Sequence, residues 1–187
     1  MEEIEKNDKK NGTLRDILDM IIYFGTVVLF VFLIYNFVGQ QVEVKGSSME
    51  TTLNDGNRLV LEKISYRFHE PERFDIIVFR PYDEIKNEYY IKRIIGLPGE
   101  TVQILGNKIY IDGEVLEEDY GNEPMKDSGM AENPIVLGEE EYFVLGDNRN
   151  HSTDSRYEVG NVRKDAIVGR TFIRIWPFQK MGLLKHQ

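Results

Sequence analysis

The chain contains no cysteine and only three histidines, so hydroxyls and amines are the main candidates for a nucleophile or a base. Ser48 lies in the segment Gly46-Ser47-Ser48-Met49-Glu50, between a short apolar run and the turn-forming residues 54–56. A serine in a glycine-containing bend can expose its hydroxyl beside free backbone N–H groups that stabilise an oxyanion. The segment by itself fits a plain linker serine at least as well.

Lys92 lies in a predicted strand over residues 89–95. Because alternate side chains of a strand share a face, Lys92 should point the same way as Tyr90 and Ile94. Two such neighbours would remove the amine from water and lower its pKa from the ordinary value of about 10.4. A lysine that acts as a general base near neutral pH needs that shift, which costs roughly 3–4 kcal/mol. The simpler alternative for this position alone is a strand lysine that reaches solvent.

A third polar segment, Gly146-Asp147-Asn148-Arg149-Asn150-His151-Ser152-Thr153-Asp154-Ser155-Arg156, follows a predicted buried strand. If this segment is extended, Ser152, Asp154 and Arg156 share a face and offer a hydroxyl and an ion pair. The alternative is a polar turn held by local side-chain hydrogen bonds. So many specific polar groups directly after a buried strand are unusual for a plain turn.

Together, the three segments resemble the bacterial type I signal peptidases, in the short form with one membrane anchor. The resemblance covers about residues 20–176 and is most specific in YIKRIIGLPGE and GDNRNHSTDSR. It implies a serine endopeptidase that removes signal peptides from exported preproteins, with Ser48 as the nucleophile and Lys92 as the general base. No metal, nucleotide or other cofactor is implied.

The resemblance also assigns supporting roles. It implies that the catalytic site is held by Ser152, Asp154 and Arg156. It implies that the pocket for the residue before the cut is lined by Met49, Leu53 and Tyr90, which would admit only a small side chain. Cleavage after Ala-x-Ala is therefore expected. The chain departs from the family pattern at Gly46, where some members carry a hydroxyl, at Thr51, where proline is usual, and at Phe74, where glycine is frequent.

The elements that must position these residues begin with a membrane anchor. Met20–Val38 contains 19 residues without a charge, which as a helix would span roughly 28 Å, close to the thickness of a bilayer core. We expect residues 1–16 to form a cytoplasmic tail and residues 17–39 a transmembrane anchor. The rival, a cleavable signal peptide, would have a shorter apolar run and a small-x-small site at its end.

Basic residues flanking the apolar run predict its orientation. Four precede it (Lys6, Lys9, Lys10 and Arg15), whereas only Lys45 follows closely. The positive-inside rule then places the N-terminus in the cytoplasm and residues 40–187 outside the cell membrane, in a single-pass protein. Trp176 and Phe178 are candidates for contact with the membrane interface, with a core tryptophan as the equally weighted alternative.

Residues 40–187 carry the pattern of a mainly β domain. Alternating or continuous apolar runs predict eight strands, at 41–44, 58–64, 75–79, 89–95, 101–105, 108–111, 141–145 and 166–176. Gly106-Asn107 and Asp112-Gly113 are hairpin-turn signals. Residues 114–140 are acidic and punctuated by Gly and Pro, which suggests a surface excursion. The resemblance to the signal peptidases implies that these strands form an antiparallel, partly closed, barrel-like arrangement.

The composition restricts the partners. With 187 residues the chain suits one domain and an appendage, and its net charge of −9 argues against non-specific nucleic-acid binding. The lack of cysteine excludes a thiol nucleophile, disulfides and cysteine-bound metals. The expected partners are preprotein signal peptides and a lipid bilayer, with no nucleic acid. No feature of the sequence specifies an oligomeric state.

Three other functions are compatible with parts of the sequence. A Ser48–His151–Asp154 triad is disfavoured because His151, next to Ser152, should point away from Asp154 in an extended chain. A self-cleaving Ser–Lys protease of the repressor type shares the dyad, but those proteins are soluble and lack an anchor. The third is an inactive, anchored paralogue that acts as a binding or assembly module. The presence of both Ser48 and Lys92 argues against it.

Overall fold

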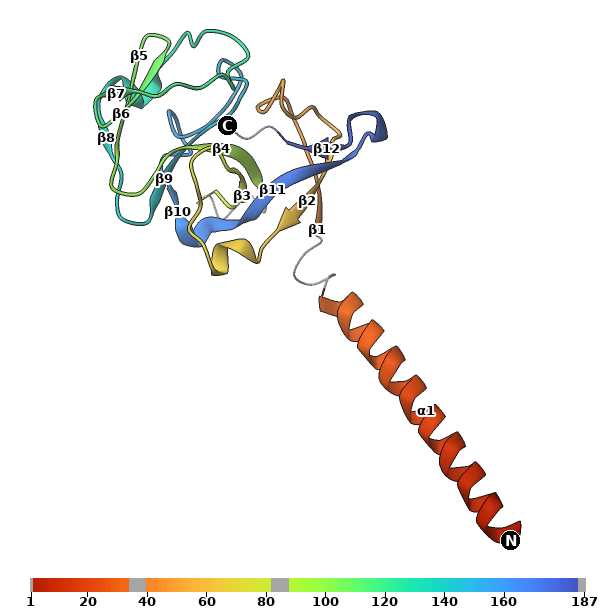
Figure 1. Ribbon diagram of the computed structural model, residues 1–187. Helices are drawn as coiled ribbons and strands as arrows, with labels where there is room; N and C mark the ends of the chain where they lie inside the picture. Colours follow the sequence, from red (N-terminus) through yellow and green to blue (C-terminus); the bar gives the residue numbers. More distant parts are fainter. Residues whose placement is uncertain (1, 34–39, 82–87, 185–187) are drawn as a thin grey trace. The chain divides into compact units, whose positions relative to one another are not determined.

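The computed structural model describes residues 2–33, 40–81 and 88–184, and its contacts divide the chain into two units, Met1–Gly39 and Gln40–Gln187. The first unit contains one helix, α1 (Glu2–Leu33), which continues through much of the segment expected as a tail (Figure 1). Among the described residues, no helix combines the length and apolar character needed to cross a membrane. The end of the predicted apolar run, residues 34–38, lies outside the described residues.

The second unit is built from two antiparallel sheets, which confirms the expected mainly β fold. The larger sheet has eight strands. Its spatial order is β1 (Gln40–Glu43), β2 (Arg58–Glu62), β11 (Ile167–Trp176), β3 (Ile76–Phe79), β4 (Tyr90–Gly96), β9 (Glu141–Leu145) and β10 (Val162–Arg163), with β12 (Gly182–Leu183) also paired to β11.

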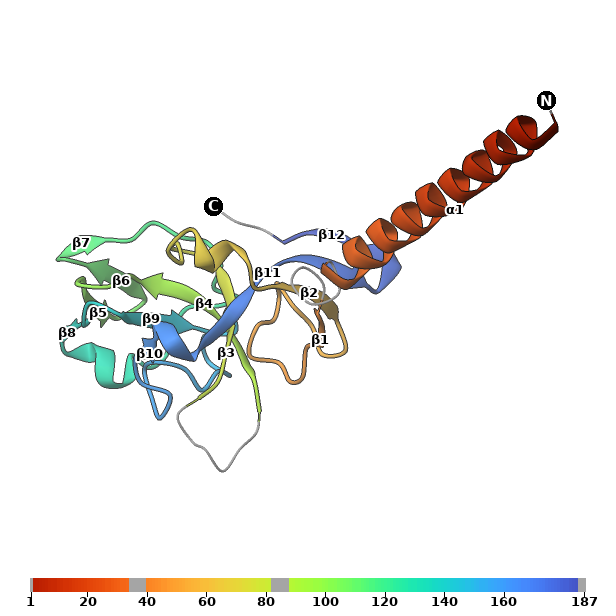
Figure 2. The ribbon, with the colours of Figure 1, turned by 90° about the horizontal axis from the view of Figure 1, so that it is seen from below.

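The smaller sheet has four strands, in the order β7 (Glu114–Val115), β6 (Lys108–Ile111), β5 (Thr101–Leu105) and β8 (Ile135–Val136). It lies at the opposite end of this unit from β1 and β2 (Figure 2). Short 3₁₀ helices interrupt the connections at Ser65–Arg67, Gly129–Glu132, Lys164–Ala166 and Phe178–Lys180. The segment 114–140 contains β7, β8 and the 3₁₀ helix Gly129–Glu132. It also contributes Met125, Ala131 and Leu137 to the core.

All eight predicted strands are present within two residues of their expected bounds, because each has enough alternating or apolar positions to signal a sheet. The four strands that were missed, β7, β8, β10 and β12, have only two residues each and carry no such pattern. The turn at Asp112-Gly113 joins β6 to β7, with both residues at positive φ (53° and 88°). This is the backbone that a tight two-residue hairpin requires.

The strand β4 separates two apolar cores. Ile94 packs in a cluster with Ile77, Phe79 and Val144, whereas its neighbour Ile95 packs in another cluster beneath the small sheet. Consecutive residues on opposite faces of β4 are what the alternation of a strand dictates. A third cluster, formed by Val44, Met49, Leu53, Leu59 and Ile76, lies at the loop that carries Ser48.

Phe74 has a backbone conformation that is uncommon for its residue type. Its φ is +73°, in the left-handed region, while its N–H donates to the Ile94 carbonyl over 2.8 Å. Its carbonyl accepts a hydrogen bond from Arg93, and its ring lies 5.2 Å from that of Tyr120. An L-residue with a side chain pays roughly 1–2 kcal/mol for this conformation. The position therefore favours glycine, as in the family that the sequence resembles.

This conformation predicts an unusual order of stabilities at residue 74. Phe74→Ala removes the ring but keeps the backbone strain, whereas Phe74→Gly removes both, so the glycine variant should be more stable by about 1 kcal/mol. Phe172, in β11 and without positive φ, is the matched control, at which alanine should be more stable than glycine. Urea unfolding of the four variants measures both differences. An alanine variant at 74 as stable as the glycine variant would contradict the strain.

Candidate active site

The loop that carries Ser48 is anchored at both ends by the apolar core. Val44 and Met49, on either side of the bend, are 3% and 1% exposed. The bend itself starts at Gly46, which has φ +85° and donates its N–H to the Asp55 carboxylate over 2.7 Å. Ser48 is left half-buried between these anchors. The polar side chain is thus fixed on a short loop whose apolar neighbours set its position.

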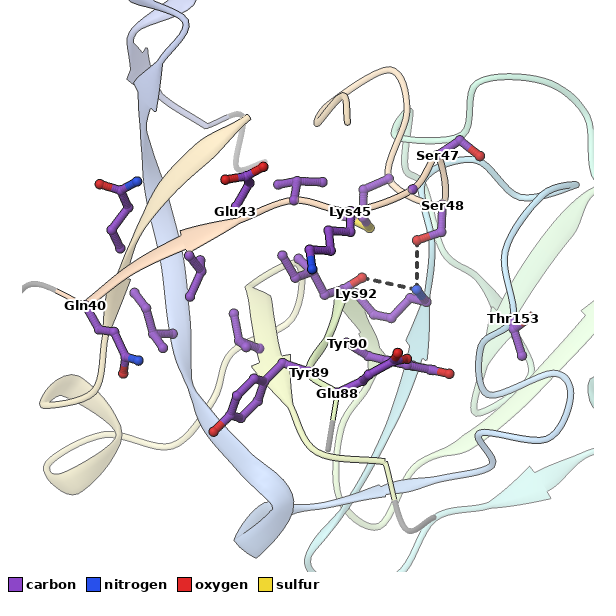
Figure 3. A pocket seen from close by; sticks show the side chains of 18 of the residues that line it. Gln40, Glu43, Lys45, Ser47, Ser48, Glu88, Tyr89, Tyr90, Lys92 and Thr153 are labelled. Carbon is purple, nitrogen blue, oxygen red and sulfur yellow. Dashed lines mark hydrogen bonds between the residues drawn. The ribbon is translucent and has the colours of Figure 1, made fainter. Parts of the chain in front are cut away.

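Lys92 comes from the centre of the large sheet, on β4, where it pairs with Ile77 of β3. It is only 5% exposed. Its Nζ lies 2.9 Å from Ser48 Oγ and donates a longer bond of 3.2 Å to the Ile91 carbonyl (dashed lines in Figure 3). The Tyr90 ring, on the same face, has its centroid 5.4 Å from the amine. The structure therefore brings together the hydroxyl and the amine that the sequence singled out.

Burial lowers the pKa of the Lys92 amine from 10.5 to about 8, and the charges of Asp154 and Asp147 oppose this shift. A charged amine is poorly stabilised where water is excluded, so the neutral form gains relative weight. At neutral pH a useful fraction of Lys92 molecules then carries a free electron pair. The amine can accept a proton from the serine hydroxyl that it contacts.

Both carboxylates near the amine are paired with buried arginines. Asp154 accepts two hydrogen bonds of 2.9 Å from Arg156, and neither side chain is exposed. Asp147 accepts bonds of 2.9 and 2.7 Å from Arg93, again with neither side chain exposed. The ion pair between Asp154 and Arg156 was expected from the sequence. The pairing of Arg93 with Asp147 was not, because nothing in the residue spacing places them together.

Ser152 is buried close to this pair, at 9% exposure, and its Oγ has no hydrogen-bond partner within the described part of the chain. It faces Gly146, where any added Cβ would clash with both Ser152 Oγ and the Ser48 carbonyl oxygen. The N–H of Gly146 donates to Asp154 over 3.1 Å. Residue 146 must therefore lack a side chain for the serine loop and the polar segment to meet.

Asn148 makes two further contacts with the serine loop. Its N–H donates to the Ser48 carbonyl and its Nδ2 donates to the Ser47 carbonyl, each over 3.0 Å. Sequence reasoning singled out neither Asn148 nor Gly146. Both contact backbone carbonyl groups of the serine loop, and the residue types of that loop do not reveal which residues contact its backbone. The only available signal was their place in the polar segment 146–156.

A cavity of about 640 Å³ opens beside the dyad. One side is formed by Gln40–Met49 and the other by Glu88–Lys92, with Leu61 and Val78 between them and His151 and Thr153 at the catalytic end. In Figure 3, Glu43 and Lys45 lie across this cavity from Tyr89 and Tyr90. Met49 and Tyr90, two of the three residues predicted for the substrate pocket, line this cavity. Leu53 does not: it is 0% exposed in the core, where its N–H donates to the Met49 carbonyl.

The geometry does not form a histidine triad. His151 is exposed, and in the part of the chain that the structure describes its ring makes no hydrogen bond with Ser48 or Asp154. Asp154 is instead occupied by Arg156 and Gly146. Among residues 2–33, 40–81 and 88–184, no three His, Asp or Glu side chains are arranged to hold a metal ion. The hydroxyl–amine pair is the arrangement that can perform acyl transfer.

Comparison with known proteins identifies the family of the chain. The family model described as signal peptidase, peptidase S26, matches residues 17–176. Signal peptidase I of Leptolyngbya laminosa is 40% identical over 174 residues, 90% of this chain and 84% of that protein. Signal peptidase I of Bacillus licheniformis is 35% identical over 188 residues, 97% of this chain and 98% of that protein. A crystal structure of a signal peptidase I from Enterococcus faecalis V583 aligns at 37% identity with a TM-score of 0.46, covering 55% of this chain and 97% of that one. The chain therefore belongs to the signal peptidase family, peptidase S26.

Proposed function

We propose that this protein is a membrane-anchored serine endopeptidase that removes N-terminal signal peptides from exported preproteins, with Ser48 as nucleophile and neutral Lys92 as general base. The observation that carries the proposal is the 2.9 Å contact between Ser48 Oγ and the amine of a lysine that is only 5% exposed. Membership of the signal peptidase family supports the substrate class. An inactive paralogue would gain nothing from burying a lysine amine, which costs free energy.

Each step of the reaction has a group to perform it. Lys92 removes the proton of Ser48, whose Oγ attacks the scissile carbonyl. The Ser48 N–H makes no hydrogen bond in the described part of the chain and can stabilise the resulting oxyanion. Protonated Lys92 then gives its proton to the leaving amine, which leaves an acyl-enzyme. Lys92 next takes a proton from a water molecule, whose oxygen attacks the ester carbonyl. As the bond to Ser48 Oγ breaks, Lys92 returns that proton to Oγ and both groups regain their starting forms.

The cavity fits an extended peptide. Within the described sheet, β1 pairs only with β2, so its other edge is free to pair with a substrate strand. The cavity continues along this edge from Gln40 to Ser48. Met49 and Tyr90 occupy the wall next to the dyad, and Leu53 supports Met49 from behind. We infer that this wall leaves room for alanine but not for a large residue before the cut, which gives the Ala-x-Ala preference.

The polar groups around the dyad would hold it in place. Asp154 and Arg156 fix the segment that packs against the serine loop, and the unpartnered Ser152 hydroxyl is free to bond the lysine amine or the substrate. We assign all three to support of the site rather than to bond making. Their burial favours this role, because groups without contact to water keep one geometry through the reaction.

Membrane attachment is the remaining part of the proposal. Large apolar side chains of α1 are exposed from Ile17 to Phe32, as expected of a segment that meets lipid. At the other end of the chain Trp176, Phe178, Met181 and Leu183 are all exposed, with the two aromatic rings 4.8 Å apart. We propose the predicted single-pass topology, with the N-terminus in the cytoplasm, and the C-terminal group as a second contact with the bilayer interface.

The dyad predicts complete dependence on both groups. Ser48→Ala removes the nucleophile and Lys92→Met replaces the amine with an apolar side chain of similar length, so each variant should lose at least about 10³-fold in kcat/KM. Lys108→Met, at an exposed strand position in the small sheet, is the matched control and should retain activity. Cleavage of a purified preprotein, with circular dichroism to verify folding, gives the answer. Near-normal turnover by folded Lys92→Met would exclude lysine as the base.

The lowered pKa of Lys92 predicts the pH profile. Only the neutral amine is a base, so kcat/KM should rise with pH and reach half its maximum near the pKa of about 8. His151→Ala should leave this midpoint in place. Measurement of kcat/KM on a peptide substrate from pH 6 to 10 tests both statements. An acidic limb centred near the ordinary histidine value of about 6.5, lost in His151→Ala, would favour the triad instead.

The anchor predicts a difference between two substrates. Residues 40–187, which form a separate unit by their contacts, should cleave a short soluble peptide about as well as the full chain does. On a preprotein inserted in lipid vesicles, the truncated protein should be at least about tenfold slower, because the anchor supplies local concentration. Kinetic assays of both proteins on both substrates provide the test. Equal losses on the two substrates would show that residues 1–39 support folding rather than presentation of substrate.

A further inference from the structure

One asparagine donates hydrogen bonds to the two carbonyl groups on either side of the Ser48 Cα. Asn148 donates its backbone N–H to the Ser48 carbonyl and its side-chain Nδ2 to the Ser47 carbonyl, each over 3.0 Å. Asn148 is 5% exposed, so water does not compete with these bonds. The side-chain bond joins positions that are 101 residues apart in the sequence. These contacts are therefore part of how the polar segment 146–156 and the serine loop meet.

These two hydrogen bonds determine the direction in which the Ser48 N–H points. The Ser47 carbonyl and the Ser48 N–H belong to one planar peptide unit and point in opposite directions. A donor that holds the Ser47 oxygen therefore also sets the direction of the Ser48 N–H. The second bond holds the next peptide unit, so rotation about Ser48 is restrained from both sides.

The orientation of the Asn148 amide is determined by this contact. Turning the amide over would place Oδ1 against the Ser47 carbonyl oxygen, with two acceptors and no proton between them. In the observed orientation, Oδ1 is buried without a partner in the described part of the chain. A buried, unpaired oxygen costs free energy, so the amide is kept here despite a cost to the fold. The bond to Ser47 also polarises the peptide unit and strengthens its N–H as a donor.

We propose that Asn148 is a positioning residue of the peptidase, which aims the Ser48 N–H at the oxyanion. This proposal rests on the proposed function, in which Ser48 is the nucleophile. Asn148 does not line the cavity, so it should not contribute to the binding of ground-state substrate. Its effect belongs to the transition state, where negative charge develops on the scissile oxygen. It also plays no part in proton transfer, so the pH profile of the enzyme should not depend on it.

The test compares Asn148→Ala and Asn148→Asp in the full-length enzyme with the matched control Asn150→Ala. Asn150 is a half-buried loop asparagine that donates to the Pro124 carbonyl and accepts from the Lys126 N–H, away from the serine loop. Asn148→Ala removes the donor and should lower kcat by at least about tenfold. The loss should be smaller than the roughly 10²–10³-fold loss that follows removal of a direct oxyanion donor. Asn148→Asp replaces the donor with a charged acceptor of the same shape and should lower kcat further.

The measurements are kcat and KM on an Ala-x-Ala peptide, the pH midpoint of kcat/KM and the melting temperature. We expect KM within about twofold of wild type for both Asn148 variants, an unchanged pH midpoint for Asn148→Ala, and wild-type kinetics for Asn150→Ala. Asn148→Asp adds a carboxylate near Lys92, so its pH midpoint should move upward. If Asn148→Ala does not fold, Asn148→Asp, compared above its own pH midpoint, supplies kcat and KM, because its volume is unchanged.

Three results would overturn the proposal: wild-type kcat in a folded Asn148→Ala, a loss confined to KM, or a kcat loss that Asn150→Ala shares. A failure of the proposed function would look different, because Ser48→Ala would then remain active or the wild-type enzyme would not cut the peptide.

Discussion

A lysine amine can act as a base near neutral pH only where exclusion of water lowers its pKa. In this fold two carboxylates are buried near that amine. Burial lowers the pKa of Lys92, whereas the charges of Asp154 and Asp147 raise it. Left unpaired, two buried carboxylates would hold the amine in its charged, inactive form. Arg156 and Arg93 prevent this by taking one carboxylate each in a two-bond contact. In the proposed mechanism both arginines are thus conditions for the chemistry, although neither is among the hydrogen-bond partners of Ser48 in the described part of the chain.

The same arginines connect the site to the rest of the domain. Besides its carboxylate, Arg93 donates to the Phe74 carbonyl, and its guanidinium lies 3.6 Å from the centroid of the Tyr120 ring. Arg156 donates to the carbonyl of Asp127, in the acidic segment 114–140. Buried ion pairs seldom add net stability, since desolvation offsets most of their attraction. Their value here is that a shift of the acidic segment or of Phe74 cannot occur without disturbing the groups around the amine.

The sequence predicts this fold better than it predicts the site. Strands of four or more residues leave a periodic or apolar pattern, and so β4 and the faces of its side chains could be assigned in advance. The contact between Ser48 and Lys92 joins residues 44 apart, and only the family resemblance linked them. Backbone contacts are less visible still: Gly146 and Asn148 act through an absent side chain and through carbonyl oxygens. Leu53 shows the opposite error, because an apolar residue near a nucleophile fits a pocket wall and a core equally well.

Within the described residues, the outer edge of β1 pairs with no other strand. An unpaired edge strand invites association with other chains, and soluble proteins usually protect it with charge or with a covering loop. Here Gln40, Gln41, Glu43 and Lys45 supply polar and charged side chains along that edge. Such side chains discourage stacking of apolar sheets while they leave the backbone N–H and carbonyl groups free to pair. The strand leads directly to the bend at Gly46, so a peptide that pairs with β1 is carried to Ser48 in an extended form. Under the proposed function, the edge is therefore open where a substrate backbone would pair, and its side chains would limit which chains can use it.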